Sequence, residues 1–248
     1  MKKAILSIGF ILLALSLFAQ EQKETIPPDK IASDRPGQSL NGMTIASGAA
    51  QIQTGFASGF GSFFSTNSLH QLRIGLSDRL EINGGIGLYI DEDVYELTGF
   101  SVGARYNILR KEGALLSIQA SAGFPRFLRF DTQWERVQYS GTIIIGHPLG
   151  EHIYLTVNLG SSSGIWQQEF GMFGTLNLVA PIGDRWEVFI EYFDTYTERT
   201  SLNSSFDAGL GYYIGTNGKV DLSLGMLNAF ESEVRNSFID LGISWVFR

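Results

Sequence analysis

The sequence predicts an all-β protein, an antiparallel transmembrane β-barrel of about twelve strands with short periplasmic turns and longer external loops. Three observations predict this fold. The 248-residue chain contains 29 Gly, is 12% aromatic and is only 17% charged, a composition that favours strands and tight turns over helices. Apolar and polar residues alternate with a period of two in most of the segments. Short and longer connections alternate between those segments, as in outer-membrane barrels.

The amino terminus predicts export. Lys2 and Lys3 precede an apolar run over residues 4–18, and the small residue Ala19 precedes polar Gln20. This order is typical of a secretory signal peptide, which we assign to residues 1–19 with cleavage after Ala19. The alternative is a membrane anchor helix, but spanning a bilayer takes roughly 18 to 20 apolar residues, more than this run provides.

The stretch LEINGGIGLYI, residues 80–90, shows the alternation most clearly, with Leu80, Ile82 and Ile86 on one face and Glu81 and Asn83 on the other. An apolar face directed at lipid and a polar face directed into a closed lumen explain this pattern. The alternative, an ordinary packed sheet, shares the alternation. We expect strands at 49–59, 67–77, 80–91, 96–109, 114–124, 135–147, 152–162, 168–180, 185–195, 203–214, 219–228 and 236–247.

The connections fall into two classes. We expect short polar turns at 77–79, 110–113, 148–152, 181–185 and 215–219, and longer links after the odd-numbered strands. A first strand that starts at the periplasm places the short turns there and the long loops outside. The last strand carries an apolar stripe that ends in Trp245 and Phe247, which resembles the closing strand recognised by the outer-membrane assembly machinery. Arg248 follows the final aromatic residue and departs from that pattern.

Charge and composition exclude several classes of function. Without Lys2 and Lys3, 16 basic residues stand against 25 acidic ones, so nucleic acid is not an expected partner. The chain has no cysteine, which excludes disulfides and thiolate metal sites. We expect no cofactor, no metal site and no catalytic residue, because His147 and His152 flank a predicted turn on the rim opposite the external loops, away from lipid substrates of the outer leaflet.

Alternation also assigns polar side chains to the lumen, where they would line the path of a permeant. Their excess is acidic, which favours cations, and the arginines are expected to pair with neighbouring carboxylates. Two interpretations stay open, a solvated channel and a lumen packed with side chains. The predicted lumen residues are Arg73, Glu81, Asn83, Arg105, Asn107, Glu187, Glu191, Asp207 and Asp240.

Residues 20–47 precede the barrel, which we assign to residues 48–248. Prolines and few apolar residues argue against a helix or central strand in this segment. It is either a disordered periplasmic tail or a plug that enters the lumen through Asp34, Arg35 and Pro36. In the second case Arg35 would be anchored by Glu187 or Asp240, because its planar guanidinium suits a carboxylate.

The stretch SDRPGQSLNGMTIASGAAQIQTGF, residues 33–56, resembles the start of the outer-membrane transporter family named after the MetA pathway of phenol degradation. That family has Thr where this chain has Ser33, and an acidic residue where it has Gln53. The resemblance implies an outer-membrane barrel that passes small, including hydrophobic, molecules without covalent chemistry. Its expected partners are outer-membrane lipids and the permeant. The alternatives are a structural or adhesive barrel with a closed lumen and, third, a lipid-modifying enzyme.

Overall fold

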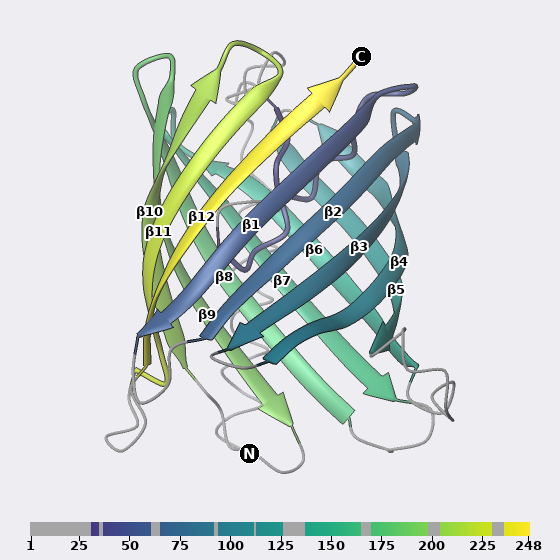
Figure 1. Cartoon of the computed structure of the whole chain (residues 1–248). Coiled ribbons are helices and arrows are strands. Elements are labelled where there is room, and N and C mark those ends of the chain that lie inside the picture. Colours follow the sequence, from purple (N-terminus) through teal and green to yellow (C-terminus); the bar gives the residue numbers. More distant parts are fainter. Residues whose placement is uncertain are drawn as a thin grey trace, which may run out of the picture.

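The computed structural model describes residues 31–34, 37–60, 65–91, 94–111, 113–125, 137–164, 170–197, 204–229 and 236–248. They form one closed antiparallel barrel of twelve strands (Figure 1), which confirms the predicted fold class. The strands are β1 (Ala50–Phe60), β2 (Ser65–Ser77), β3 (Leu80–Asp91), β4 (Val94–Lys111), β5 (Ala114–Pro125), β6 (Gln138–Leu149), β7 (Ile153–Gly164), β8 (Phe170–Ile182), β9 (Trp186–Thr197), β10 (Ser205–Ile214), β11 (Gly218–Leu227) and β12 (Asn236–Phe247). Within these ranges, no helix is long and apolar enough to cross a membrane.

The first and last strands close the barrel. β1 pairs with β12 in continuous register from Ala50 opposite Phe247 to Phe60 opposite Ser237. Every other strand pairs with its two neighbours in the chain. Each of the described strands therefore has a partner strand on both sides, so the ring leaves no free strand edge, as a barrel in lipid requires.

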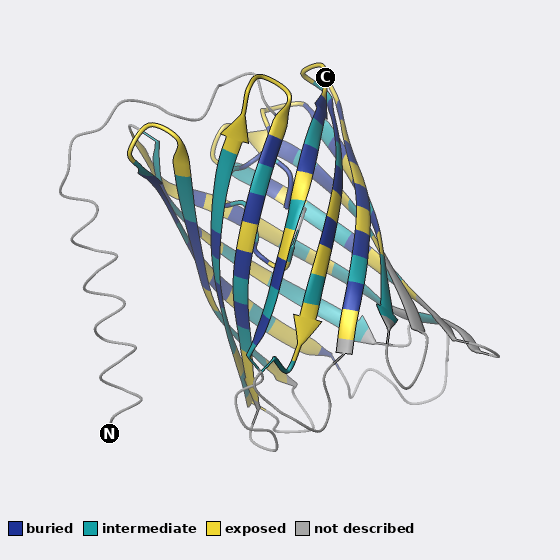
Figure 2. Ribbon diagram, turned by 90° about the vertical axis from the view of Figure 1, so that its left-hand side faces the viewer, coloured by how far each residue is buried: buried dark blue, intermediate teal, exposed yellow. Residues whose placement is uncertain are grey.

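The two faces of the wall differ as the alternation predicts. Outward-facing Ile52, Leu72 and Leu241 are 44 to 50% exposed, whereas inward-facing Gln51 and Arg73 are fully buried. Exposed and buried residues alternate along the strands (Figure 2). Large apolar side chains thus cover the outside of the barrel, while polar ones are enclosed within it.

The barrel has two different ends. The carboxyl terminus lies at one of them, at the top of Figure 1, together with the connections of two or three residues between β2 and β3, β4 and β5, β6 and β7, β8 and β9, and β10 and β11. We call it the short-turn end and the opposite one the long-loop end. A positive φ of 74° at Gly150 and 60° at Gly215 allows two of these tight turns.

Two predictions about the connections are wrong. The link between β3 and β4 is not long, because their pairing continues to Asp91 opposite Val94 and leaves only residues 92–93 between them. Pro148 and Pro181 belong to the ends of β6 and β8 rather than to turns, and a proline is tolerated there because a strand end needs fewer ladder hydrogen bonds. His147 therefore lies in β6, buried, with its Nδ1 2.6 Å from the Pro148 carbonyl oxygen.

Candidate functional site

Residues 31–34 and 37–47, which we call the inner segment, lie inside the barrel near the short-turn end (Figures 1 and 2). Ile31 and Ile45 pack with Ala49 and with inward-facing Tyr213 and Val246 in a buried apolar cluster. The segment thus enters and leaves the lumen at one place, close to the start of β1. Between these points its residues contact the wall at successive strands.

A buried cluster of charges holds the first part of the inner segment. Arg105 of β4 donates from Nη1 and Nη2 to the two carboxylate oxygens of Asp34 at 2.9 and 2.8 Å. Arg73 of β2 lies 3.5 Å from the same carboxylate and donates to Glu81 of β3 at 2.8 and 2.9 Å. Both arginines and Glu81 are fully buried. The positive charges of Arg73 and Arg105 are therefore balanced by the carboxylates of Asp34 and Glu81 only while Asp34 is in place.

The surroundings of Asp34 shift its acidity. Burial alone raises the pKa of this carboxyl group, but the positive charges of Arg105 and Arg73 outweigh burial, and the pKa lies below its ordinary value of 3.8. The backbone N–H of Asn41 also donates to Asp34, at 2.8 Å. Asp34 is therefore ionised at neutral pH, and its ionised form is the one that the arginines bind.

The middle of the inner segment is bound by β9 and β8. The backbone N–H of Gln38 and the hydroxyl of Ser39 donate to the two oxygens of the Glu191 carboxylate at 2.8 and 2.6 Å. The Ser39 hydroxyl also lies 2.6 Å from that of Thr175. Gly37 precedes them with a φ of 87°, and a side chain there would collide with Glu191. A glycine is thus required where the segment approaches this carboxylate.

The last part of the inner segment follows β7 back to β3. The Asn158 side chain accepts from the Leu40 N–H at 2.6 Å and donates to the Leu40 carbonyl at 3.2 Å. Ser117 donates to the Gly42 carbonyl at 2.7 Å. The Ile45 N–H donates to Glu81 at 3.0 Å. The segment is therefore bonded to the wall on several sides of the lumen, not along one strand.

The remaining acidic residues gather on β9 to β12. Glu187 of β9 is bonded to the Tyr213 hydroxyl and paired with Lys219. Asp207 of β10 is directly opposite Glu191 in the register and is 3% exposed. Asp240 of β12 is also buried. One wall of the lumen thus carries most of the negative charge, and the arginines are on the other.

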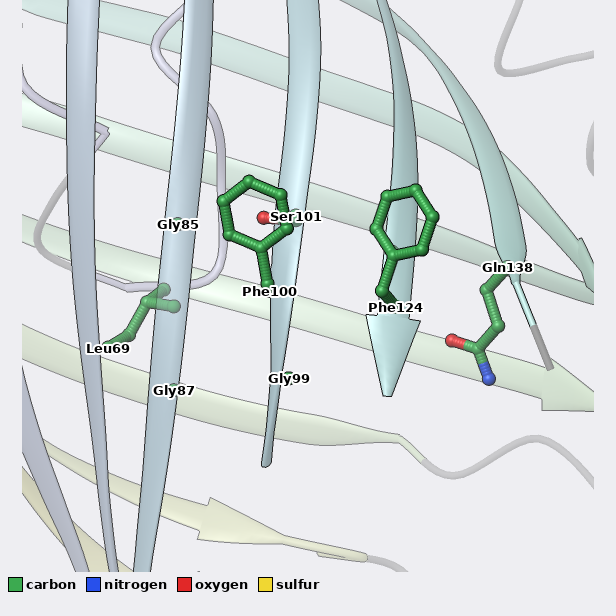
Figure 3. A pocket seen from close by; sticks show the side chains of 9 residues that line it. Leu69, Gly85, Gly87, Gly99, Phe100, Ser101, Phe124 and Gln138 are labelled. Atoms are coloured by element: carbon green, nitrogen blue, oxygen red, sulfur yellow. The ribbon is translucent and has the colours of Figure 1, made fainter. Parts of the chain in front are cut away.

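The described part of the lumen is not filled on the long-loop side of the inner segment. Leu69 shares the inward face of β2 with Arg73, yet it is 55% exposed. Beside it lies a hollow of about 230 Å³ that spans β2 to β6 (Figure 3). The lining residues within the described ranges are uncharged; they are Leu69, Gly85, Gly87, Gly99, Phe100, Ser101, Gly123, Phe124 and Gln138. Glycines that leave this side of the lumen without side chains make the hollow.

The structure places the nine residues predicted for the lumen on the inward face, and all but Asn83 are buried. It brings Arg73, Glu81 and Arg105 together with Asp34, and Glu191 beside Asp207. Asn107 joins the site through Thr44, to which it donates at 3.2 Å. Arg35 and Pro36 lie outside the described residues, and so does the predicted anchoring of Arg35 by Glu187 or Asp240.

Several residues of the site were not predicted. Ser117 and Thr175 of the wall bind the inner segment, and Leu115 and Ile144 pack against Gly42. The alternation in β5 places Leu115 on the same face as Ser117, so its inward position could have been found. The contact with Gly42 could not, because it depends on the path of the inner segment. Among the described residues, no group of three or more His, Asp or Glu side chains is arranged to hold a metal ion.

No family model matches the chain, and no curated protein matches it. Solved barrels match its fold. The COG4313 outer membrane channel from Pseudomonas putida F1 has a TM-score of 0.63 and 12% identity over 86% of this chain and 99% of that one. The NanC porin gives 0.62 and 7% over 78% and 98%, and the KdgM porin gives 0.55 and 12% over 79% and 100%. At such identities the likeness concerns the fold, which is that of outer-membrane barrels.

Proposed function

We propose that this protein is a channel for small molecules in the outer membrane of a diderm bacterium, and that the inner segment is its plug. The observation that carries the proposal is the bond between Asp34 and the two buried arginines, which fixes the segment across the lumen. On the long-loop side of this bond, the neutral hollow near Leu69 would admit solutes. The lumen thus has an open vestibule and a closed base.

The resemblance of residues 33–56 to the MetA-pathway transporter family supports the same function, and we propose membership of that family. It implies small, including hydrophobic, permeants, and exposed Leu69 beside an uncharged hollow suits such compounds. The channel performs no covalent chemistry in this proposal. The signal peptide over residues 1–19 would direct export, and the short-turn end would face the periplasm.

Recordings in planar bilayers test the channel. The full chain is compared with a variant that lacks residues 31–46. We expect low or intermittent conductance from the full chain and larger, sustained conductance from the variant, because the base of the lumen is then unblocked. An equally small conductance from both, with the variant correctly assembled, would contradict the channel.

The second candidate is a structural or adhesive barrel with a closed lumen. The complete burial of Arg73, Glu81 and Arg105 favours it, because these side chains pack as a fixed core does. In that case the deletion variant assembles poorly or conducts nothing, and external loops carry the function. Membrane fractionation and cysteine labelling from outside intact cells, at residue 163 against residue 216, test the location and orientation for both candidates.

A further inference from the structure

The lumen wall binds the inner segment mainly through its main chain. Wall side chains donate to the carbonyls of Ala32, Leu40, Asn41, Gly42 and Met43, and accept from the N–H groups of Gln38, Leu40 and Ile45. These groups are common to all residues except for the missing N–H of proline. The wall therefore binds much of the segment through groups that any peptide shares, and it demands particular residues only at a few positions, such as Gly37 beside Glu191.

One contact shows this recognition most directly. The Asn158 amide bonds both the N–H and the carbonyl of Leu40, at 2.6 and 3.2 Å, so one amide side chain reads both polar groups of one residue. The side chain of Leu40 is not itself buried, and Gln38 is exposed. Replacing either side chain would leave these backbone bonds intact.

The second element of the site is a carboxylate receptor. Arg105 binds Asp34 through two parallel hydrogen bonds, and Arg73 adds a second cation at 3.5 Å. Paired N–H donors of this kind match any carboxylate. An acidic side chain or a free carboxyl terminus would present the same group in the same place.

We propose that the base of the lumen is a binding site for short peptides that carry a carboxylate, and that the inner segment is its built-in occupant. This inference rests on the proposed channel, because a soluble peptide reaches the site only through the lumen. A peptide that binds there would displace the inner segment and open its own path.

The test adds peptides to the variant that lacks residues 31–46, in planar bilayers. A synthetic peptide of residues 31–47 is expected to block the conductance, and the same peptide with Asp34→Asn is expected to need at least about tenfold more, since truncating a buried charge pair weakens binding by that much or more. Both peptides carry an amidated carboxyl terminus, so that Asp34 supplies the single carboxylate, and equal block by the two would overturn the proposal. The conductance before peptide is added tests the channel separately.

A second measurement uses the full chain in case the variant does not assemble. The chain has no cysteine, so Thr44→Cys introduces a single thiol at a buried position of the inner segment. Short peptides with a free carboxylate are expected to accelerate its labelling several-fold, while their amide-capped forms and uncharged saccharides are not. Labelling that no peptide accelerates would overturn the proposal.

Discussion

Two stretches of the same inward face of β2 differ sharply. Arg73 is fully buried, and Leu69, four residues toward the long-loop end, is 55% exposed. The strand, its register and its alternation are continuous between them. The difference comes from the inner segment, which covers the first position and does not reach the second. The number of strands thus permits a wide lumen, and a stretch of the chain outside the strands decides how much of it is open.

The base of the lumen and the hollow also differ in charge. The sealed base contains the arginines, Glu81 and Asp34, whereas the hollow on its long-loop side is lined by uncharged residues in the described part of the chain. Buried ions require partners because removing them from water costs several kcal/mol each. The base is therefore sensitive to single substitutions, and the open half, where water can solvate polar groups, is tolerant of them.

The largest effect is expected from Asp34→Ala, which leaves Arg73 and Arg105 with only Glu81. Breaking a buried ion pair by removing one partner costs about 3 to 5 kcal/mol, so the inner segment should undock. We expect longer channel openings and cleavage by chymotrypsin after Leu40 or Met43. Asn83→Ala is the matched control beside the same cluster, since Asn83 is opposite Arg73 in the register and its amide nitrogen has no hydrogen-bond partner among the described residues. Equal cleavage of both variants would contradict the expectation that the Asp34 carboxylate holds the inner segment in place.

A smaller effect on the stability of the docked inner segment is expected when a glycine is replaced by a larger residue. In Gly42→Val, the new Cβ would lie 2.9 Å from a methyl carbon of Ile144 and would also press on Leu115, and overpacking of this kind costs about 1 to 3 kcal/mol. In Gly123→Val, the nearest atom is 3.9 Å away, so we expect no loss. The concentration of urea at which chymotrypsin cuts the inner segment measures both variants. A lower value for Gly123→Val would contradict the open hollow.

Much of the fold could be predicted from the sequence. Alternation identifies β12 and places Trp245 outward, because a period of two fixes the face of every residue once one is known. The length of a connection is less predictable. Pairing continues to Asp91 opposite Val94, since hydrogen bonds between strands can extend beyond the apolar band that the pattern detects.

The site was predicted less completely. Alternation placed Arg73, Glu81 and Arg105 on the inward face of three adjacent strands, where the structure has them. It could not reveal that Asp34, 71 residues before Arg105, would bind there, because this contact depends on closure of the ring and on the path of a segment without periodic pattern. The prediction centred on Arg35, whereas in the described residues the neighbouring acid makes the bond.

The effect of pH on the docking of the inner segment should be smaller still near neutral pH. The pKa of Asp34 in the docked segment lies below its ordinary value of 3.8. Docking is therefore fully stabilised above that value and loses the stabilisation as the pH falls through the docked pKa. We expect the rate of chymotrypsin cleavage, measured on samples returned to neutral pH after brief acid exposure and immediate addition of protease, to be constant down to pH 5 and to rise only below about pH 4. Asp34→Asn should show no rise attributable to this residue, and a rise shared by both would assign acid opening to other carboxylates.

The smallest effect is expected in the hollow. Gln138 lines it and is exposed, so Gln138→Glu adds one solvated charge to the vestibule without touching the inner segment. Salt screens such a charge over about 8 Å at 0.15 M, and we therefore expect a modest shift of the reversal potential toward cation preference, larger at low salt. Recordings of the variant in a potassium chloride gradient measure it, with Gln138→Asn as the uncharged control. Chymotrypsin cleavage of the inner segment should stay unchanged in both, because the charge lies in the open half. A change in cleavage would show that the two halves of the lumen are coupled rather than independent.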